Sequence, residues 1–245
     1  KMASVKLKVS EEVSEGVLLW NASLVLKTYL EDKRRCEFAG ATVLELGAGA
    51  GHLSLALSRM GARVTTSEAK CNEQAKGTTP CKCWGCILQL RHSLGRQLGG
   101  EGAAAVAVDE WVPVEEGAVR AIELEWGESN AQKWSIREEL ATLQNRPDIL
   151  IMSEVIYNQS GDSLYDDEFH DNLVWTLMQL VKPGTIVYNV FVDRPFSFMF
   201  FAKIDELPGK PFQVQEIKEE EYDNLGLDDD DAKVFLHRLV YSPSE

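Results

Sequence analysis

The sequence predicts one α/β domain built on a doubly wound sheet of seven strands, mostly parallel with an antiparallel C-terminal strand. Short apolar runs alternate with stretches whose apolar residues recur at helical spacing. Such alternation is typical of a parallel sheet covered by helices on both faces. The last two apolar runs have no helix between them, so a hairpin is the simplest connection and one of these two strands should run antiparallel.

The expected elements follow from local patterns along the chain. The strands are expected at residues 41–46, 64–67, 119–124, 148–152, 185–192, 212–217 and 234–241. Helices are expected at residues 22–30, 53–60, 87–98, 168–181 and 197–207. The continuous apolar run at 148–152 indicates a strand that is buried on both faces. Lys182-Pro183-Gly184 ends the fourth of these helices, because proline and glycine do not continue a helix.

The length of 245 residues fits a single domain over 1–245, without an interdomain linker. Residues 1–40 form the N-terminal entry segment of this domain. Residues 71–114 are the least regular part and are expected to be an insertion that carries the helix 87–98. Residues 219–231 form an acidic loop, a composition typical of a solvated segment.

The net charge of −14 argues against a nucleic-acid partner and suits a basic protein partner. No apolar stretch approaches the roughly 18 residues that a membrane span needs, and residues 1–15 lack the apolar core of a signal peptide. We therefore expect a cytoplasmic, monomeric protein that does not bind membranes.

Four of the five cysteines, Cys71, Cys81, Cys83 and Cys86, fall in one short segment. With His92 they could supply four ligands to a structural zinc ion. However, the Cys-x-Cys-x-x-Cys spacing is not that of a standard zinc finger, and a second well-formed pair is missing. We expect a reduced, irregular insertion and no metal site.

A glycine-rich loop follows the first expected strand. Its residues run Glu45-Leu46-Gly47-Ala48-Gly49-Ala50-Gly51, and a helix follows, which is the pattern of a nucleotide-cofactor site in a Rossmann-like sheet. His52 takes the place at which a dinucleotide-binding loop has its third glycine. The carboxylate of Glu45 would disfavour a pyrophosphate but would complement the ammonium group of S-adenosylmethionine. The loop therefore predicts S-adenosylmethionine as the cofactor.

A second acid, Glu68, ends the second expected strand. A carboxylate at this place can accept hydrogen bonds from both hydroxyl groups of a ribose. The alternative is a surface glutamate at a strand end, which the glycine loop upstream makes less favoured.

Three tracts resemble the seven-strand protein-lysine methyltransferases of methyltransferase family 16, the methyltransferase-like 21 group. The first runs from Gly16 to Ala22 and is followed by Leu26 and Tyr29-Leu30. The second is Glu123-Leu124-Glu125-Trp126-Gly127, similar to the family's tryptophan-glycine motif, and the third, Asp148 to Tyr157, is similar to its Asp-x-x-Tyr motif. The resemblance runs from about Gly16 to Tyr241, except for the insertion and the acidic loop.

This resemblance implies roles for five further residues. Trp20 and Trp126 are expected to line the cofactor pocket, with Trp126 near the adenine, and Ser153 is expected to touch the cofactor. Glu154 and Tyr157 are expected to shape the acceptor channel as catalytic residues, although Glu154 replaces the family's aspartate. Core packing is the alternative for both tryptophans and for Tyr157.

The resemblance implies transfer of a methyl group from S-adenosylmethionine to a lysine side chain of a protein substrate. Two alternatives stay open. One is a methyltransferase that acts on another protein side chain, such as histidine, or on a small molecule. The other is an inactive cofactor-binding domain that serves as an interaction module.

Overall fold

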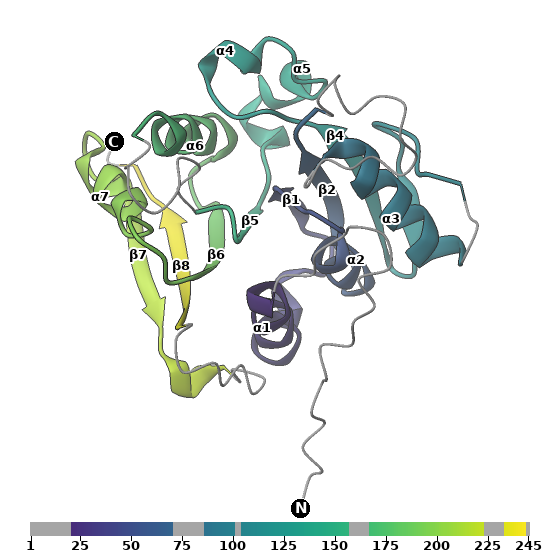
Figure 1. The fold of residues 1–245 in the computed structure, drawn as a ribbon, viewed down its shortest axis with the longest axis horizontal. Coiled ribbons are helices and arrows are strands. Elements are labelled where there is room, and N and C mark those ends of the chain that lie inside the picture. Colours follow the sequence, from purple (N-terminus) through teal and green to yellow (C-terminus); the bar gives the residue numbers. More distant parts are fainter. Residues whose placement is uncertain (1–20, 71–85, 101–103, 157–166, 223–232, 244–245) are drawn as a thin grey trace, which may run out of the picture.

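The computed structural model describes residues 21–70, 86–100, 104–156, 167–222 and 233–243. One sheet of eight strands, in the order β3-β4-β2-β1-β5-β6-β8-β7, carries helices on both faces (Figure 1). No helix among the described residues is both long and apolar enough to cross a membrane.

The elements follow the expected alternation of strands and helices. The strands are β1 Thr42–Leu46, β2 Arg63–Glu68, β3 Val112–Val114, β4 Gly117–Glu123, β5 Ile149–Ser153, β6 Ile186–Val192, β7 Phe212–Ile217 and β8 Val234–Tyr241. The helices are α1 Asn21–Tyr29, α2 His52–Arg59, α3 Ile87–Gly99, α4 Glu128–Ala131, α5 Arg137–Leu140, α6 Asp167–Leu180 and α7 Met199–Glu206.

The strand count of seven was wrong by one, because β3 lies inside the segment that was expected to be irregular. β3 has three residues and pairs antiparallel with β4 through the tight turn between Val114 and Gly117. Its sequence is Val-Pro-Val, and a proline cannot donate a hydrogen bond to a neighbouring strand. β3 tolerates Pro113 because it is the edge strand of the sheet.

The direction of the strands confirms the predicted sheet type. β1 pairs parallel with β2 and β5, β2 with β4, and β5 with β6. β8 runs antiparallel to both β6 and β7, as expected for one strand of a C-terminal hairpin. The carboxyl ends of β1, β2, β4, β5 and β6 therefore meet at one edge of the sheet, where open α/β sheets bind ligands.

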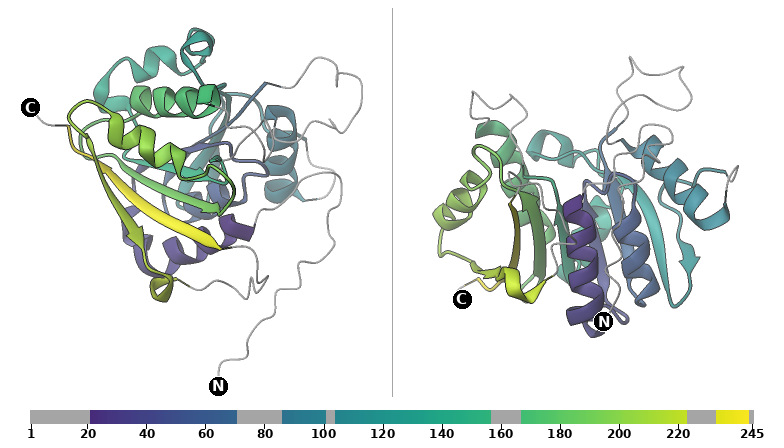
Figure 2. Two further views of the ribbon diagram at one scale, coloured as in Figure 1. Left: turned by 60° about the vertical axis from the view of Figure 1, so that its left-hand side comes forward. Right: turned by 60° about the horizontal axis from the view of Figure 1, so that its bottom comes forward.

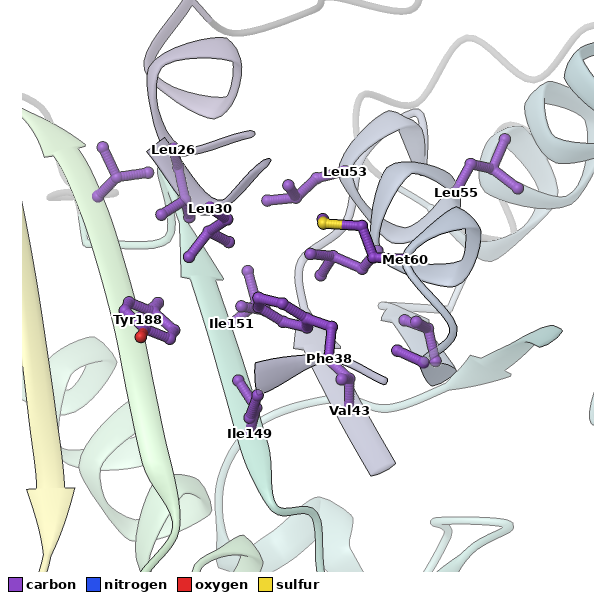
Figure 3. Packing of buried hydrophobic residues seen from close by; sticks show 14 of the residues in the cluster. Leu26, Leu30, Phe38, Val43, Leu53, Leu55, Met60, Ile149, Ile151 and Tyr188 are labelled. Atoms are coloured by element: carbon purple, nitrogen blue, oxygen red, sulfur yellow. The ribbon is translucent and has the colours of Figure 1, made fainter. Parts of the chain in front are cut away.

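Two apolar clusters hold the helices against the sheet. On one face, α1, α2 and α3 pack on the strands, and Figure 2 shows α1 and α2 side by side across it. Phe38 lies at the centre of this cluster, between Met60 and Ile151 (Figure 3). On the other face, the second cluster joins α5, α6 and α7 to the strands, with Leu150, Phe191 and Leu177 fully buried. The site at the carboxyl edge thus rests on a core with a buried apolar cluster on each face of the sheet.

Candidate functional site

Four loops meet at the carboxyl edge of the sheet. The glycine loop that follows β1 is hydrogen bonded to the end of β2, since the Ala48 N–H donates to the Ser67 carbonyl over 3.0 Å. It also lies against the loops that follow β4 and β5. A Cβ atom on Gly47 would stand 2.7 Å from Val155 Cγ1 and 3.7 Å from Trp126 Cζ2. The residues that the sequence singled out on separate strands are therefore neighbours.

The three glycines of the loop all have positive φ angles but different surroundings. The φ angles of Gly47, Gly49 and Gly51 are +63°, +55° and +74°, a region that glycine adopts without steric cost. A Cβ on Gly51 would meet Leu90 and Leu94 of α3 at 2.9 and 2.7 Å, so this glycine permits helix packing. A Cβ on Gly49 would meet no atom of the described residues within 4 Å. Gly49 is thus the glycine that faces open space.

Glu68 ties the end of β2 to the glycine loop. Its Oε1 accepts a hydrogen bond from the Gly49 N–H at 2.6 Å, and its Oε2 accepts one from the Ala69 N–H at 3.2 Å. The side chain is buried, which raises the pKa of the carboxyl, while these two hydrogen bonds lower it. Each oxygen keeps a second lone pair, so the carboxylate can still accept hydroxyl donors.

Glu45 is buried beneath the loop and faces α2. Its carboxylate accepts a hydrogen bond from the Ser54 hydroxyl group. Burial raises the pKa of Glu45 to about 7, and the negative charge of Glu68 acts in the same direction, while the Ser54 hydrogen bond opposes it. Glu45 is therefore balanced between its neutral and its charged form near neutral pH, and a nearby cation would favour the charged form.

Ser153 and Trp126 lie where the expected pocket needs them. Ser153 ends β5 and is buried, and its Oγ has no hydrogen-bond partner among the described residues. A buried hydroxyl group without a partner is costly unless a ligand or a water molecule satisfies it. The half-buried ring of Trp126 packs against Phe169 of α6, with 5.4 Å between ring centroids. Trp126 thus borders both the glycine loop and α6.

Glu154 follows β5 with a φ angle of +57°, which is unusual for a residue other than glycine. Its Oε1 accepts the Val192 N–H at 2.9 Å, and its Oε2 lies 2.6 Å from Nη1 of Arg194. Burial raises the pKa of this carboxyl, whereas the charge of Arg194 and the two hydrogen bonds lower it. Sequence reasoning missed Arg194. The available signal was a basic residue two positions after an expected strand that ends at the same edge.

Several expected residues lie outside the described part of the chain. Trp20 and Tyr157 are among them, as are Cys71, Cys81 and Cys83. Cys86 is described and is buried directly before α3. Among the described residues, no group of three or more His, Cys, Asp or Glu side chains could hold a metal ion.

Comparison with known proteins agrees with this architecture. A family model described as lysine methyltransferase matches residues 1–75 of the chain. Methyltransferase-like protein 22 of Mus musculus is 28% identical over 194 residues, which cover 75% of this chain and 40% of the mouse protein. The chain thus aligns with less than half the length of this curated relative. The expected resemblance to methyltransferase family 16 is confirmed by these two matches.

Solved structures share the architecture at low sequence identity. A protein assigned as a methyltransferase and solved in complex with SAH matches 91% of this chain and 50% of its own, with a TM-score of 0.50 and 12% identity. The fold is a Rossmann-like methyltransferase fold. Another structure, the SAM-dependent methyltransferase from Agrobacterium tumefaciens, gives a TM-score of 0.47 with 16% identity over 92% of this chain and 64% of its own. In a methyltransferase fold, the carboxyl edge described above is the ligand-binding edge.

Proposed function

We propose that this chain binds S-adenosylmethionine at the carboxyl edge of the sheet and transfers its methyl group to a lysine side chain of a protein substrate. The observation that carries the proposal is the glycine loop locked onto Glu68 beside Ser153, within a methyltransferase fold. The lysine acceptor is supported by the match to the lysine methyltransferase family model. The acidic charge of the chain suits a basic substrate segment.

The residues at this edge fit the proposed cofactor. Gly49 leaves open space where a ligand can approach the backbone, and the Ser153 hydroxyl lacks a partner among the described residues. Glu68 offers acceptor lone pairs for ribose hydroxyl groups, and Trp126 offers an aromatic surface beside the loop. When bound, S-adenosylmethionine supplies a methyl group activated by its sulfonium. Gly47, Gly49, Glu68, Trp126 and Ser153 would hold it, and Gly51 would shape the loop from behind.

The chain's own contribution to transfer is alignment of the acceptor. A lysine amine has an unperturbed pKa of about 10.4, so only about one amine in 2,500 is uncharged near pH 7. The amine must lose its proton and then be held at a fixed distance and angle, because orientation supplies much of the rate gain in such a displacement. In this proposal Glu154 orients the incoming amine, and Tyr157 together with Trp20 completes the acceptor channel and the pocket.

Cofactor binding is the first test. We expect S-adenosylmethionine and S-adenosylhomocysteine to raise the melting temperature of the purified protein, because a ligand that binds only the folded state stabilises it. NAD should leave the melting temperature unchanged. Stabilisation by NAD in place of the two other ligands would contradict the assignment of the glycine loop.

Methyl transfer is the second step of the same test. The protein and radiolabelled S-adenosylmethionine are incubated with a hypomethylated cell lysate, and labelled proteins are hydrolysed to identify the methylated amino acid. We expect label in protein bands and recovery of methyl-lysine. Methyl-histidine or labelled small molecules would favour the other enzymes considered above. Cofactor binding without any transfer would favour an interaction module.

The pKa of Glu45 predicts a proton release. If the cofactor's ammonium group lies near Glu45, its positive charge should lower the pKa of Glu45 from about 7, so that the carboxyl group loses a proton on binding. Titration calorimetry of S-adenosylhomocysteine at pH 6.5 to 7, in buffers of different ionisation enthalpy, measures this release. Glu45→Gln keeps a partner for Ser54 but cannot titrate, so it should release fewer protons. Equal proton release by both proteins would place the ammonium away from Glu45.

A further inference from the structure

We propose that Arg194 is a positioning residue of the acceptor site, which holds the Glu154 carboxylate in place as an anion at the carboxyl end of β5. This inference rests on the proposed function, since it assigns to Arg194 a role in preparing the site that receives the acceptor amine. Arg194 itself does not need to touch the amine.

The geometry describes a clamp between two neighbouring strands. The Glu154 N–H donates to the carbonyl of Val190 at 2.9 Å, which extends the pairing of β5 with β6 by one residue. The side chain then turns back to the end of β6, where the Val192 N–H and Arg194 each bind one carboxylate oxygen. Glu154 is thus fixed by three hydrogen bonds, all of them to β6 or to the residues directly after it.

This clamp explains why a glutamate keeps a left-handed backbone at this position. A non-glycine residue with positive φ persists only where its surroundings determine its conformation. The three bonds fix this conformation, and they direct the carboxylate towards the carboxyl end of β6. Without Arg194, one oxygen would lose its charged partner, and the orientation of the carboxylate would rest on the Val192 N–H alone.

Arg194 also favours the charged form of Glu154, against the effect of burial. The Glu154 side chain is 3% exposed, and burial favours the neutral carboxylic acid, whereas Arg194, whose side chain is 28% exposed, favours the anion. A neutral Glu154 could not attract the ammonium group of a lysine. Other charged residues described near this edge are Glu45, Glu68, Glu123, Asp193 and Lys233. Glu45 accepts the hydroxyl group of Ser54 in α2, and Glu68 accepts the N–H groups of Gly49 and Ala69 in the loops that follow β1 and β2.

The pairing also bears on deprotonation of the acceptor. An unpaired buried carboxylate would bind a lysine ammonium tightly and thereby oppose loss of its proton. Because the positive charge of Arg194 opposes the negative charge of Glu154, the pair can orient the amine with a smaller rise in its pKa than an unpaired carboxylate would cause. Arg194 thus lets one carboxylate serve for docking and still permit the amine to react.

An unfolding cycle tests the pair without any substrate. The free energy of unfolding is measured in urea from pH 5 to pH 9 for the wild type, Arg194→Gln, Glu154→Gln and the double variant. Loss of Arg194 should raise the folded-state pKa of Glu154 above its wild-type value. When the pKa of a carboxyl group is higher in the folded than in the unfolded state, the free energy of unfolding falls as pH rises from the unfolded-state pKa to the folded-state pKa. The difference in unfolding free energy between the wild type and Arg194→Gln should therefore widen as pH rises. The difference between Glu154→Gln and the double variant should stay constant with pH.

Methyl transfer into the hypomethylated lysate is the second arm. Arg194→Gln should lose at least tenfold in transfer at pH 7 and recover part of it by pH 9, because Glu154 then ionises only at higher pH. Arg194→Lys keeps the positive charge. The rise of its transfer rate with pH should therefore begin closer to the pH at which the wild-type rate rises. Arg59→Gln is the matched control, since Arg59 pairs with Glu115 at 3.3 Å at the far end of α2.

The outcomes separate this inference from the proposed function. A gap in unfolding free energy that does not change with pH, or an equal loss of transfer at every pH, would overturn the role of Arg194. If the wild type binds the cofactor but labels no protein, the proposed function fails. The unfolding cycle would still decide whether Arg194 holds Glu154 as an anion.

Discussion

The variant Gly49→Val is expected to bind S-adenosylhomocysteine at least 100-fold more weakly than the wild type, a loss of about 2.7 kcal/mol. A Cβ atom at position 49 meets no atom of the described residues within 4 Å, so it would project into the space where the ligand should lie. The Gly49 N–H would also have to keep its bond to Glu68 in a backbone conformation that valine disfavours. Titration calorimetry on the folded variant measures the loss.

Gly51→Val is the matched control for this experiment. Both glycines have positive φ angles, so both variants pay a similar backbone cost of about 1–2 kcal/mol. At position 51 the added side chain would collide with Leu90 and Leu94, which are core residues of α3. Gly51→Val should therefore lower the free energy of unfolding by roughly 2–4 kcal/mol, while the folded fraction binds the ligand within tenfold of the wild type. Wild-type affinity of Gly49→Val would mean that the ligand approaches from another side.

Most of the fold could be predicted from hydrophobic periodicity, because most strands and helices carry a recognisable pattern in their own residues. The apolar runs of β1, β5 and β6 have few polar residues, as strands covered on both faces should. β3 was missed for the opposite reason. Three residues with a central proline give no periodic signal, and only pairing with β4 makes them a strand. The short helices α4 and α5 likewise depend on contacts with the rest of the fold more than on their own pattern.

The candidate site also has a part that the sequence could predict and a part that it could not. Gly47, Glu68 and Ser153 could be placed at one edge from sequence, because the carboxyl ends of parallel strands coincide. The pairing of Glu154 with Arg194 could not, since the two residues are 40 positions apart. It depends on the register of β5 against β6 and on a left-handed residue at the end of β5. Such contacts are set by the tertiary structure.

Three buried glutamates at this edge differ in their partners, and this separates their proposed roles. Glu45 is bonded to a neutral hydroxyl group and titrates near neutral pH, so it can respond to a cofactor's charge. Glu68 is bonded to backbone N–H groups, which leaves it suited to shaping the loop and accepting hydroxyl donors. Glu154 is bonded to an arginine, whose charge opposes the rise in pKa that burial causes. The hydrogen-bond partners of these three glutamates therefore distinguish their proposed roles, although the residue type is the same.

Glu68→Ala is expected to weaken S-adenosylhomocysteine binding by roughly 10- to 100-fold, about 1–3 kcal/mol, because two expected bonds to the ribose are lost. The loss includes a contribution from the loop, since the Gly49 N–H would lose its buried acceptor at 2.6 Å. Glu68→Gln keeps an oxygen for that N–H but removes the charge, so it should lie between the wild type and Glu68→Ala.

The matched control is Glu123→Ala, at the end of β4. Glu123 is the register partner of Glu68 on the neighbouring parallel strand, so its removal changes the net charge of the same edge by the same amount. If the effect of Glu68 comes from its bonds to the loop and the ribose, Glu123→Ala should bind the ligand within about twofold of the wild type, well under 1 kcal/mol. A similar loss of affinity in both variants would indicate that the total negative charge of this edge, and not the specific hydrogen bonds of Glu68, determines binding. If Glu68→Ala binds the ligand with wild-type affinity, the end of β2 is not part of the cofactor site. The assignment of Gly49 would then fail as well, because Glu68 holds Gly49 in place.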